Sequence, residues 1–169
     1  AGPFQFPHTA AHQAWYAAVN ALFDPFKTFK ADYSVIPWAT FVEPEVARVG
    51  LNEADARAEG IAYEVTKFGI DDLDRAIADS EAHGFVKVLT VPGKDRILGV
   101  TIVGEAAGEL IAPWCIAMRA GLGIGAVAGI PLPAGARSDA SRRAALSFHA
   151  ALTSRPALRR LIGFLRRFG

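Results

Sequence analysis

Residues 84–104 read GFVKVLTVPGKDRILGVTIVG, and this stretch decides the fold. It contains two apolar runs, 85–91 and 96–104, that are separated by the turn sequence PGKD. Apolar, β-branched runs joined by a short Pro/Gly turn predict a β-hairpin. We therefore expect two neighbouring antiparallel strands here.

Three further elements are expected between the hairpin and the N-terminal region. Residues 33–42 are rich in β-branched and aromatic side chains and predict a strand, which Pro37 would confine to a sheet edge or a bulge. Residues 61–68 alternate as a second strand. Between the two, Asn52 should cap a short helix that Gly60 closes.

The N-terminal region predicts one amphipathic helix. Residues 9–23 carry apolar side chains at helical spacing, and Thr9 is the expected N-cap. The helix should end before Pro25, because proline disfavours helical geometry in the residue before it. A polar link then leads to the first strand.

The C-terminal half predicts mainly helices. Residues 105–120 form the pattern of a buried helix despite Pro113, and 121–135 form a Gly/Pro-rich connection with one short helix. Two more helices are expected over 138–153 and 156–167. This order of elements predicts an α+β fold with an antiparallel β-sheet flanked by helices, which cover it on one side.

The composition fits one globular domain. The chain has 169 residues, of which 51% are hydrophobic and 21% charged. The single cysteine, Cys115, has no intrachain disulfide partner, which fits a reducing compartment. We find no secretory leader and no apolar run of the ~20 residues that cross a bilayer, and we expect a cytoplasmic location. Because the sequence does not begin with Met, we expect it to be part of a longer protein.

The charge is unevenly distributed along the chain. From Arg137 onward there are eight arginines and one acid, giving +7, whereas the preceding residues carry ten basic and sixteen acidic side chains, giving −6. Such a basic tail binds an acidic protein surface, a phosphate backbone or an anionic membrane, or packs on the acidic body of its own chain. The charge alone does not choose between these.

Two motifs give a more specific indication. The segment 33–61, YSVIPWATFVEPEVARVGLNEADARAEGI, and the segment 84–111, GFVKVLTVPGKDRILGVTIVGEAAGELI, resemble the dimerisation domain of pyridine nucleotide-disulfide oxidoreductases. The resemblance is to the class I enzymes, which include dihydrolipoamide dehydrogenase and mercuric reductase, and is strongest to the mercuric reductase-like branch. The matching positions of the first motif are Pro37, Thr40, Pro44, Glu45, Ala47, Val49 and Gly50.

The resemblance implies a division of the chain and a set of partners. Residues 1–31 would be a helical segment that links from an FAD-binding domain, 32–150 the dimerisation domain, and 151–169 a basic C-terminal helix. The full-length protein would be a homodimer that uses FAD and NAD(P)H. We expect this fragment to bind neither cofactor and to be inactive in isolation.

The N-terminal helix would face the flavin. In relatives of this family, the helix that follows the flavin-binding segment points its amino end at the flavin ring, where free amides favour electron-rich oxygens. The resemblance places His8, Thr9, Ala10 and Ala11 at this helix start, as cofactor-binding residues. Pro7 stands where a threonine is commoner and removes one amide.

One departure from the family concerns catalysis. Its members place a histidine, followed by Pro-Thr and a glutamate, against the flavin site of the partner subunit as an acid–base pair. Ungapped alignment puts Pro131 at the histidine and Ser138 at the glutamate, and the nearest histidine is His149. Proline exchanges no proton, so we expect no catalytic residue in this chain. Three alternatives stay open for the full-length protein: its chemistry needs no such pair, another subunit or residue supplies it, or the reductase activity is lost.

Other constellations have weaker claims to function. His8 and His12 have the i, i+4 spacing of metal ligands, but without an evident third ligand we expect no metal site. The glycines of 123–129, GIGAVAG, resemble a dinucleotide-binding loop but lack the preceding strand. Cys115 lies in an apolar context, which is typical of a buried small hydrophobe rather than a reactive thiolate.

A different class of function remains as the alternative. A stand-alone interaction module would keep the fold, lose the redox chemistry and use the basic tail. The tail's amphipathic pattern also fits a membrane-surface helix, although such helices more often dock on their own domain. We expect no nucleic-acid binding and no membrane attachment.

Overall fold

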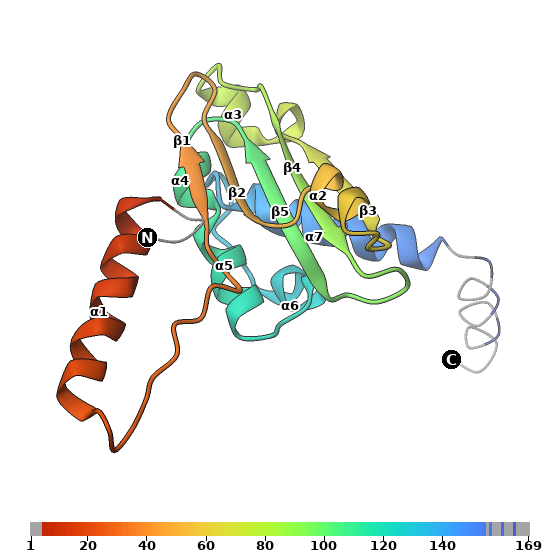
Figure 1. Cartoon of the computed structure of the whole chain (residues 1–169). Helices are drawn as coiled ribbons and strands as arrows, with labels where there is room; N and C mark the ends of the chain where they lie inside the picture. Colours follow the sequence, from red (N-terminus) through yellow and green to blue (C-terminus); the bar gives the residue numbers. More distant parts are fainter. Residues whose placement is uncertain (1–4, 155, 157–159, 161–163, 165–169) are drawn as a thin grey trace.

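The computed structural model describes residues 5–154 together with Pro156, Arg160 and Phe164 (Figure 1). The helix expected over 156–167 lies outside the described residues apart from those three, so it stays a prediction.

Five strands form one antiparallel sheet, as the sequence predicted. The predicted hairpin is present, and its strands pair from Phe85 opposite Val103 to Thr90 opposite Ile97. In spatial order the strands are β1 (Trp38–Thr40), β2 (Val46–Gly50), β5 (Ile97–Val103), β4 (Phe85–Thr90) and β3 (Glu64–Gly69).

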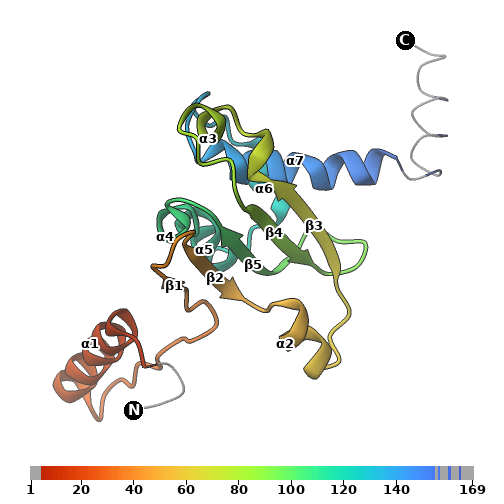
Figure 2. The ribbon, with the colours of Figure 1, turned by 90° about the horizontal axis from the view of Figure 1, so that it is seen from above.

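Helices cover the sheet mainly on one face. On that face lie α4 (Ala107–Leu110), α5 (Ala112–Arg119), α6 (Ile124–Gly129) and α7 (Asp139–Thr153), while α2 (Glu53–Ala58) lies on the other side (Figure 2). The turn η1 (Ile70–Asp72) and α3 (Asp74–Ala78) connect β3 to β4. Helix α1 (Pro7–Phe23) stands beside this body and joins it through a long link (Figure 1). The predicted α+β fold is confirmed.

The core lies between the sheet and the α4–α7 layer. Alternate strand residues point toward these helices and are 0% exposed, among them Val86, Val88, Val100 and Ile102. Trp114 of α5 is also 0% exposed, and its indole Nε1–H donates to Ser141 Oγ of α7 at 2.9 Å. Burying each large apolar side chain contributes about 1.5–3 kcal/mol, so this layer accounts for much of the stability.

The other sheet face carries charge. The strand register places Trp38, Arg48, Thr101, Lys87 and Lys67 in one row across all five strands. Helix α2 covers part of this row and neutralises part of its charge, because its Asp55 and Glu53 pair with two of these basic side chains at 3.0 and 3.5 Å.

The predicted start and end of α2 are confirmed. Asn52 is its N-cap and forms a capping box with Asp55, with N···O distances of 2.8 and 3.1 Å. Gly60 follows the helix with φ +65°, a conformation that glycine adopts without strain.

The predicted cap of α1 is wrong. The helix begins at Pro7, its N-cap is Phe6, and Thr9 lies inside the first turn with only 1% exposure. Proline is well suited to a first helical position, because its φ is already helical and the missing N–H has no partner there. The predicted end is correct, since the helix stops at Phe23.

Two strand predictions were too long. The strand expected over 33–42 is reduced to β1, because the register would place Pro37 opposite Val49, and proline has no N–H to donate to the ladder. The strand expected over 61–68 begins only at Glu64. β2 was not predicted as a separate strand, although it pairs along its whole length with β5.

The helix expected over 105–120 is two helices. α4 ends at Leu110 and α5 begins at Ala112, with proline in its first turn. Inside a continuous helix Pro113 would lose the bond to the carbonyl four residues earlier and clash with it, so the chain breaks there. The short helix within 121–135 is α6, and the helix expected over 138–153 is α7.

Candidate functional site

The first turn of α1 holds the four residues expected to face a cofactor. His8, Ala10 and Ala11 are exposed, whereas Thr9 is buried and its hydroxyl has no hydrogen-bond partner among the described residues. The first intrahelical bond runs from Ala10 N to Phe6 O at 2.9 Å. The amides before it lie at the positive end of the helix dipole, and the first turn has no acidic side chain to oppose an anion.

Helix α1 contacts mainly the link that follows it. The imidazole Nε2 atoms of His8 and His12 lie 2.7 and 3.2 Å from the carbonyl oxygens of Pro37 and Asp32. The Asn20 side chain forms two hydrogen bonds with the backbone of Phe29, at 2.8 and 2.9 Å. These contacts fix the helix to the link rather than to the sheet.

A cavity of about 530 Å³ lies between α1, the link and α5. Asp32 carries an ion pair with Arg119 at its wall. Among its lining residues are also His8, His12, Val35, Pro37, Cys115 and Ile116. Within the described residues no group of three or more His, Cys, Asp or Glu side chains is placed to hold a metal ion.

Cys115 behaves as an apolar residue. It is half-buried against the core, and burial raises the pKa of its thiol to about 11. A thiol with a raised pKa is almost fully protonated near neutral pH, and the protonated form is a poor nucleophile. Cys115 is half-buried rather than buried as predicted, but its apolar contacts and raised pKa agree with its interpretation as a small hydrophobe.

The loop between α6 and α7 carries the positions that alignment assigned to the acid–base pair. Pro131, Pro133, Ala134 and Gly135 are exposed, and Ser138 is half-buried just before α7. The loop has no titratable side chain before Arg137. It is presented at the surface, but its side chains cannot transfer a proton near neutral pH.

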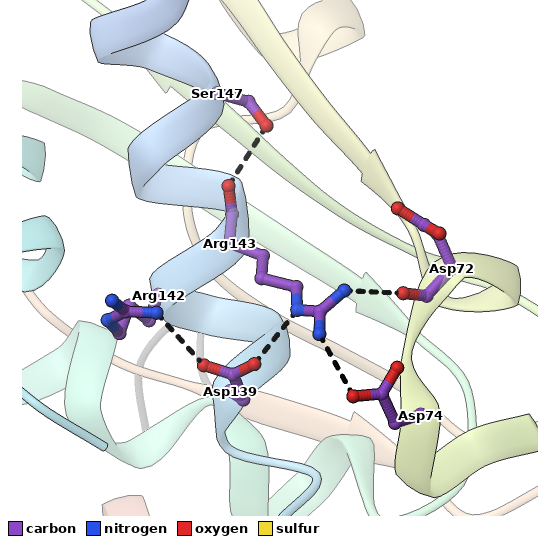
Figure 3. A network of polar contacts seen from close by, with 6 residues as sticks. All are labelled: Asp72, Asp74, Asp139, Arg142, Arg143 and Ser147. Atoms are coloured by element: carbon purple, nitrogen blue, oxygen red, sulfur yellow. Dashed lines mark hydrogen bonds and ion pairs between the residues drawn. The ribbon is translucent and has the colours of Figure 1, made fainter. Parts of the chain in front are cut away.

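The start of α7 is held by a network of charges that sequence reasoning missed (Figure 3). The Arg143 guanidinium donates to the Asp139 carboxylate at 2.8 Å, to the Asp72 carbonyl at 2.7 Å and to the Asp74 carboxylate at 3.3 Å. The hydrogen bond to Asp139 and the nearby acids raise the pKa of Arg143 further above its ordinary value. The i, i+4 spacing of Asp139 and Arg143 was a visible signal, but the contact with η1 and α3 was not.

Arg137 belongs to a second ionic cluster. Its guanidinium pairs with the carboxylates of Asp79, just after α3, and Glu105, just before α4. Asp79 also pairs with Arg75 at 2.8 Å. The end of the loop is therefore connected to two different elements of the domain.

An apolar surface is exposed beside this loop. Ile116 of α5 is 67% exposed, and Leu122 and Ile130 are 47% and 50% exposed. These residues line a groove of about 190 Å³ together with Leu132 of the loop and residues of α6. A cluster of exposed apolar side chains is typical of a surface that contacts another protein, a membrane or a ligand.

The two candidate regions do not share a cavity within one copy of the chain. The cavities beside the first turn of α1 are lined by residues 6–12, 32–41 and 108–120, and not by 131–138. The glycines of 123–129 form α6 after a helix rather than after a strand, so they are not a dinucleotide-binding loop. No helix in the described part is long and apolar enough to cross a membrane.

Comparison with known protein families shows to which family this chain belongs. The family described as the pyridine nucleotide-disulphide oxidoreductase dimerisation domain matches residues 36–132, which include the whole sheet and helices α4–α6. This chain belongs to that family. The family match supports the dimerisation-domain reading, and nothing in these comparisons supports the stand-alone module.

Among the curated relatives that match this chain are dihydrolipoyl dehydrogenases. The enzyme of Trypanosoma brucei brucei is 50% identical over 90 residues, which are 53% of this chain and 19% of that protein. The mitochondrial enzyme of Caenorhabditis elegans is 40% identical over 116 residues, which are 69% of this chain and 23% of that protein. The chain thus spans about a fifth to a quarter of these relatives.

Solved structures confirm the fold of this dimerisation domain. LpdA from Mycobacterium tuberculosis superposes with a TM-score of 0.77 at 23% identity, covering 88% of this chain and 32% of that one. The HOCl-induced flavoprotein disulfide reductase RclA from Escherichia coli gives a TM-score of 0.74 at 21% identity, covering 84% of this chain and 32% of that one.

Proposed function

We propose that this chain is the dimerising part of an FAD- and NAD(P)H-dependent oxidoreductase that works as a homodimer. The observation that carries the proposal is the family match over the sheet and α4–α6 together with the apolar surface exposed on α5 and α6. That surface would meet a second copy of the chain. Residues 1–31 would link to an FAD-binding domain, 32–150 would dimerise, and 151–169 would form a basic helix.

The first turn of α1 fits an electron-rich edge of a flavin. His8, Thr9, Ala10 and Ala11 would lie beside it, with the amides of the first turn at the positive end of the helix dipole and no acidic side chain within that turn. The Thr9 side chain is buried, so Thr9 would contribute through its backbone amide rather than through its hydroxyl. FAD, when bound, carries electrons between a reduced pyridine nucleotide and an acceptor. The role of this chain would be to orient it from one side.

The same proposal excludes acid–base catalysis by this chain. Pro131 and Ser138 would stand where the family has its histidine and glutamate, and the rest of the exposed loop would offer no substitute. The loop would then contribute shape and an apolar wall to the flavin site of the second subunit. Proton transfer would have to come from elsewhere, or the reaction would not need it.

Finer assignments belong to the same proposal. The motifs of 33–61 and 84–111 favour the class I enzymes and their mercuric reductase-like branch. FAD and NAD(P)H would be held mainly outside this chain, and this fragment would bind neither by itself. A cytoplasmic location fits the single cysteine.

The test is a matched pair of charge insertions in the full-length protein. Ile116→Asp places a charge at the most exposed apolar side chain of this surface, so we expect it to convert the dimer into a monomer. Ile77→Asp changes an isoleucine of similar exposure, 57% against 67%, on α3, and we expect it to leave the dimer intact. Light scattering after size-exclusion chromatography gives the mass of each. If the Ile116→Asp variant stays dimeric, this surface is not the interface.

A further inference from the structure

The loop 131–136 contacts the rest of the domain at both ends but has few contacts within itself. Its own backbone contact is a turn from Ala136 N to Pro133 O at 3.3 Å. At its beginning, Leu132 is half-buried in the apolar groove of α5 and α6. At its end, Arg137 enters the ionic cluster. The position of the loop therefore depends on these two attachments.

Arg137 ties the loop to two elements that are far apart in sequence. Asp79 follows α3, and Glu105 precedes α4. The Arg137 side chain is 19% exposed, and those of Asp79 and Glu105 are 23% and 45% exposed. Ion pairs that are partly shielded from water are screened less by salt than fully exposed pairs.

The chemistry of arginine suits this position. A guanidinium presents five N–H donors in a planar fork and can bind two carboxylates at once, whereas lysine offers a single point charge. Asp79 keeps a second partner in Arg75 if Arg137 is lost, but no other ion pair of Glu105 is present among the described residues. Loss of Arg137 would therefore release the loop without removing every pair of the cluster.

The next turn of the chain is held by several contacts of Arg143. Arg143 joins Asp139 of α7 to the backbone and side chain of the η1–α3 segment, as Figure 3 shows. Movement of the loop would therefore occur between Leu132 and Arg137, where Gly135 has φ +74°. Arg137 is the last attachment before this fixed point.

We propose that Arg137 is a positioning residue, which holds the 131–136 loop in the orientation in which it enters the flavin site of the second subunit. This inference rests on the proposed function, because the loop has a site to enter only in the dimer. In other members of the family, the corresponding loop would carry the acid–base pair. In this chain, the ion pairs of Arg137 would hold that loop in place. It acts through the loop and touches neither flavin nor substrate.

The first readout is hydrogen exchange in the full-length dimer. In the Arg137→Met variant we expect the amide of Ala136, which donates to the Pro133 carbonyl, to exchange at least about fivefold faster, because the loop opens locally. Arg75→Met is the matched control, since it removes a cation from the same Asp79 carboxylate without touching the loop. Its loop should exchange as in the unsubstituted protein. Arg137→Lys should restore part of the protection.

The second readout is the bound flavin, which a merely structural role in this domain would not change. We expect Arg137→Met, in a dimer with full FAD content, to shift the visible flavin spectrum and to raise quenching of flavin fluorescence by acrylamide by about twofold or more. Arg137→Lys should move both values back, and Arg75→Met should leave them unchanged. The double variant Asp79→Asn with Glu105→Gln should reproduce the Arg137→Met result.

The outcomes separate the two proposals. If the unsubstituted full-length protein lacks FAD or does not dimerise, the proposed function fails. If it is an FAD-containing dimer and Arg137→Met changes neither loop exchange nor the flavin signals, only the role of Arg137 is overturned. Faster loop exchange with unchanged flavin signals would also overturn it, because the loop would then not reach the flavin.

Discussion

Gly50 and Gly99 face each other across β2 and β5, and neither position has room for a side chain. A Cβ atom on Gly99 would lie 2.0 Å from the Leu51 carbonyl oxygen, and one on Gly50 would lie 2.4 Å from the Leu98 carbonyl oxygen. Both contacts are with backbone, which cannot rotate away. The two glycines belong to the two motifs that carry the family resemblance, so this pair is where those motifs meet.

Gly99→Ala should therefore destabilise the domain strongly. We expect the free energy of unfolding to fall by about 2 kcal/mol or more, because the added methyl group forces the two strands apart. Urea denaturation measures this change. Gly129→Ala is the control: nothing lies within 4 Å of its Cβ position at the end of α6, so that variant should be neutral or slightly more stable. Equal losses in the two variants would contradict this explanation.

The buried hydrogen bond between Trp114 and Ser141 should couple the two side chains energetically. Ser141→Ala removes the acceptor of the buried indole N–H, and an unsatisfied buried donor costs about 1–3 kcal/mol of unfolding free energy. In a Trp114→Phe background the same substitution should cost much less, because the donor is gone. A double-mutant cycle by chemical denaturation tests this coupling, and additive losses would disprove it.

The thiol of Cys115 should react slowly in the folded protein. Burial raises its pKa from 9.0 to about 11, so the native protein holds far less thiolate at mildly alkaline pH than the unfolded chain. We expect labelling by an aromatic disulfide to be slower by roughly one to two orders of magnitude than in guanidinium chloride. Because the pKa of Cys115 is raised in the folded state, the stability of the fold also depends on pH. The protonated thiol favours the folded state below pH 9, and this contribution is lost as the pH rises toward 11. Fast labelling of the native protein would refute the assignment of Cys115 as an inert residue.

If the proposed function is correct, Pro131 and Ser138 should be dispensable for catalysis by the full-length protein. Loss of an acid–base group typically costs a factor of about 10²–10⁴, whereas we expect Pro131→Ala and Ser138→Ala to change kcat/KM by less than about threefold. Steady-state assays with an acceptor that the enzyme reduces measure this. A loss of about a hundredfold in either variant would mean that the loop takes part in the chemistry after all.

Sequence reasoning succeeded where the signal was local. The β4–β5 hairpin, the Asn52 cap and the end of α1 before Pro25 follow from turn and capping preferences within a few residues. β2 was missed because its strand character comes from pairing with β5, about fifty residues later. One continuous helix was predicted over 105–120, because the apolar periodicity continues through Pro113, and the break there was missed.

The candidate site was predictable only in part. The resemblance pointed to a first helical turn and a loop, since both are short contiguous segments, and their roles in a cofactor site stay predictions. The Arg137 cluster could not, because its acids lie 58 and 32 residues away and only the fold brings them together. The burial of the Thr9 hydroxyl likewise depends on where the helix starts, and the N-cap was predicted three residues too late.

The central claim is that this chain is the dimerising part of a flavoenzyme. The most direct measurement is the mass of the full-length protein in solution, taken together with its flavin absorbance. We predict a dimer that carries about one FAD in each polypeptide and separates into monomers on Ile116→Asp. A full-length protein that is monomeric, or a dimer that contains no flavin, would contradict the account.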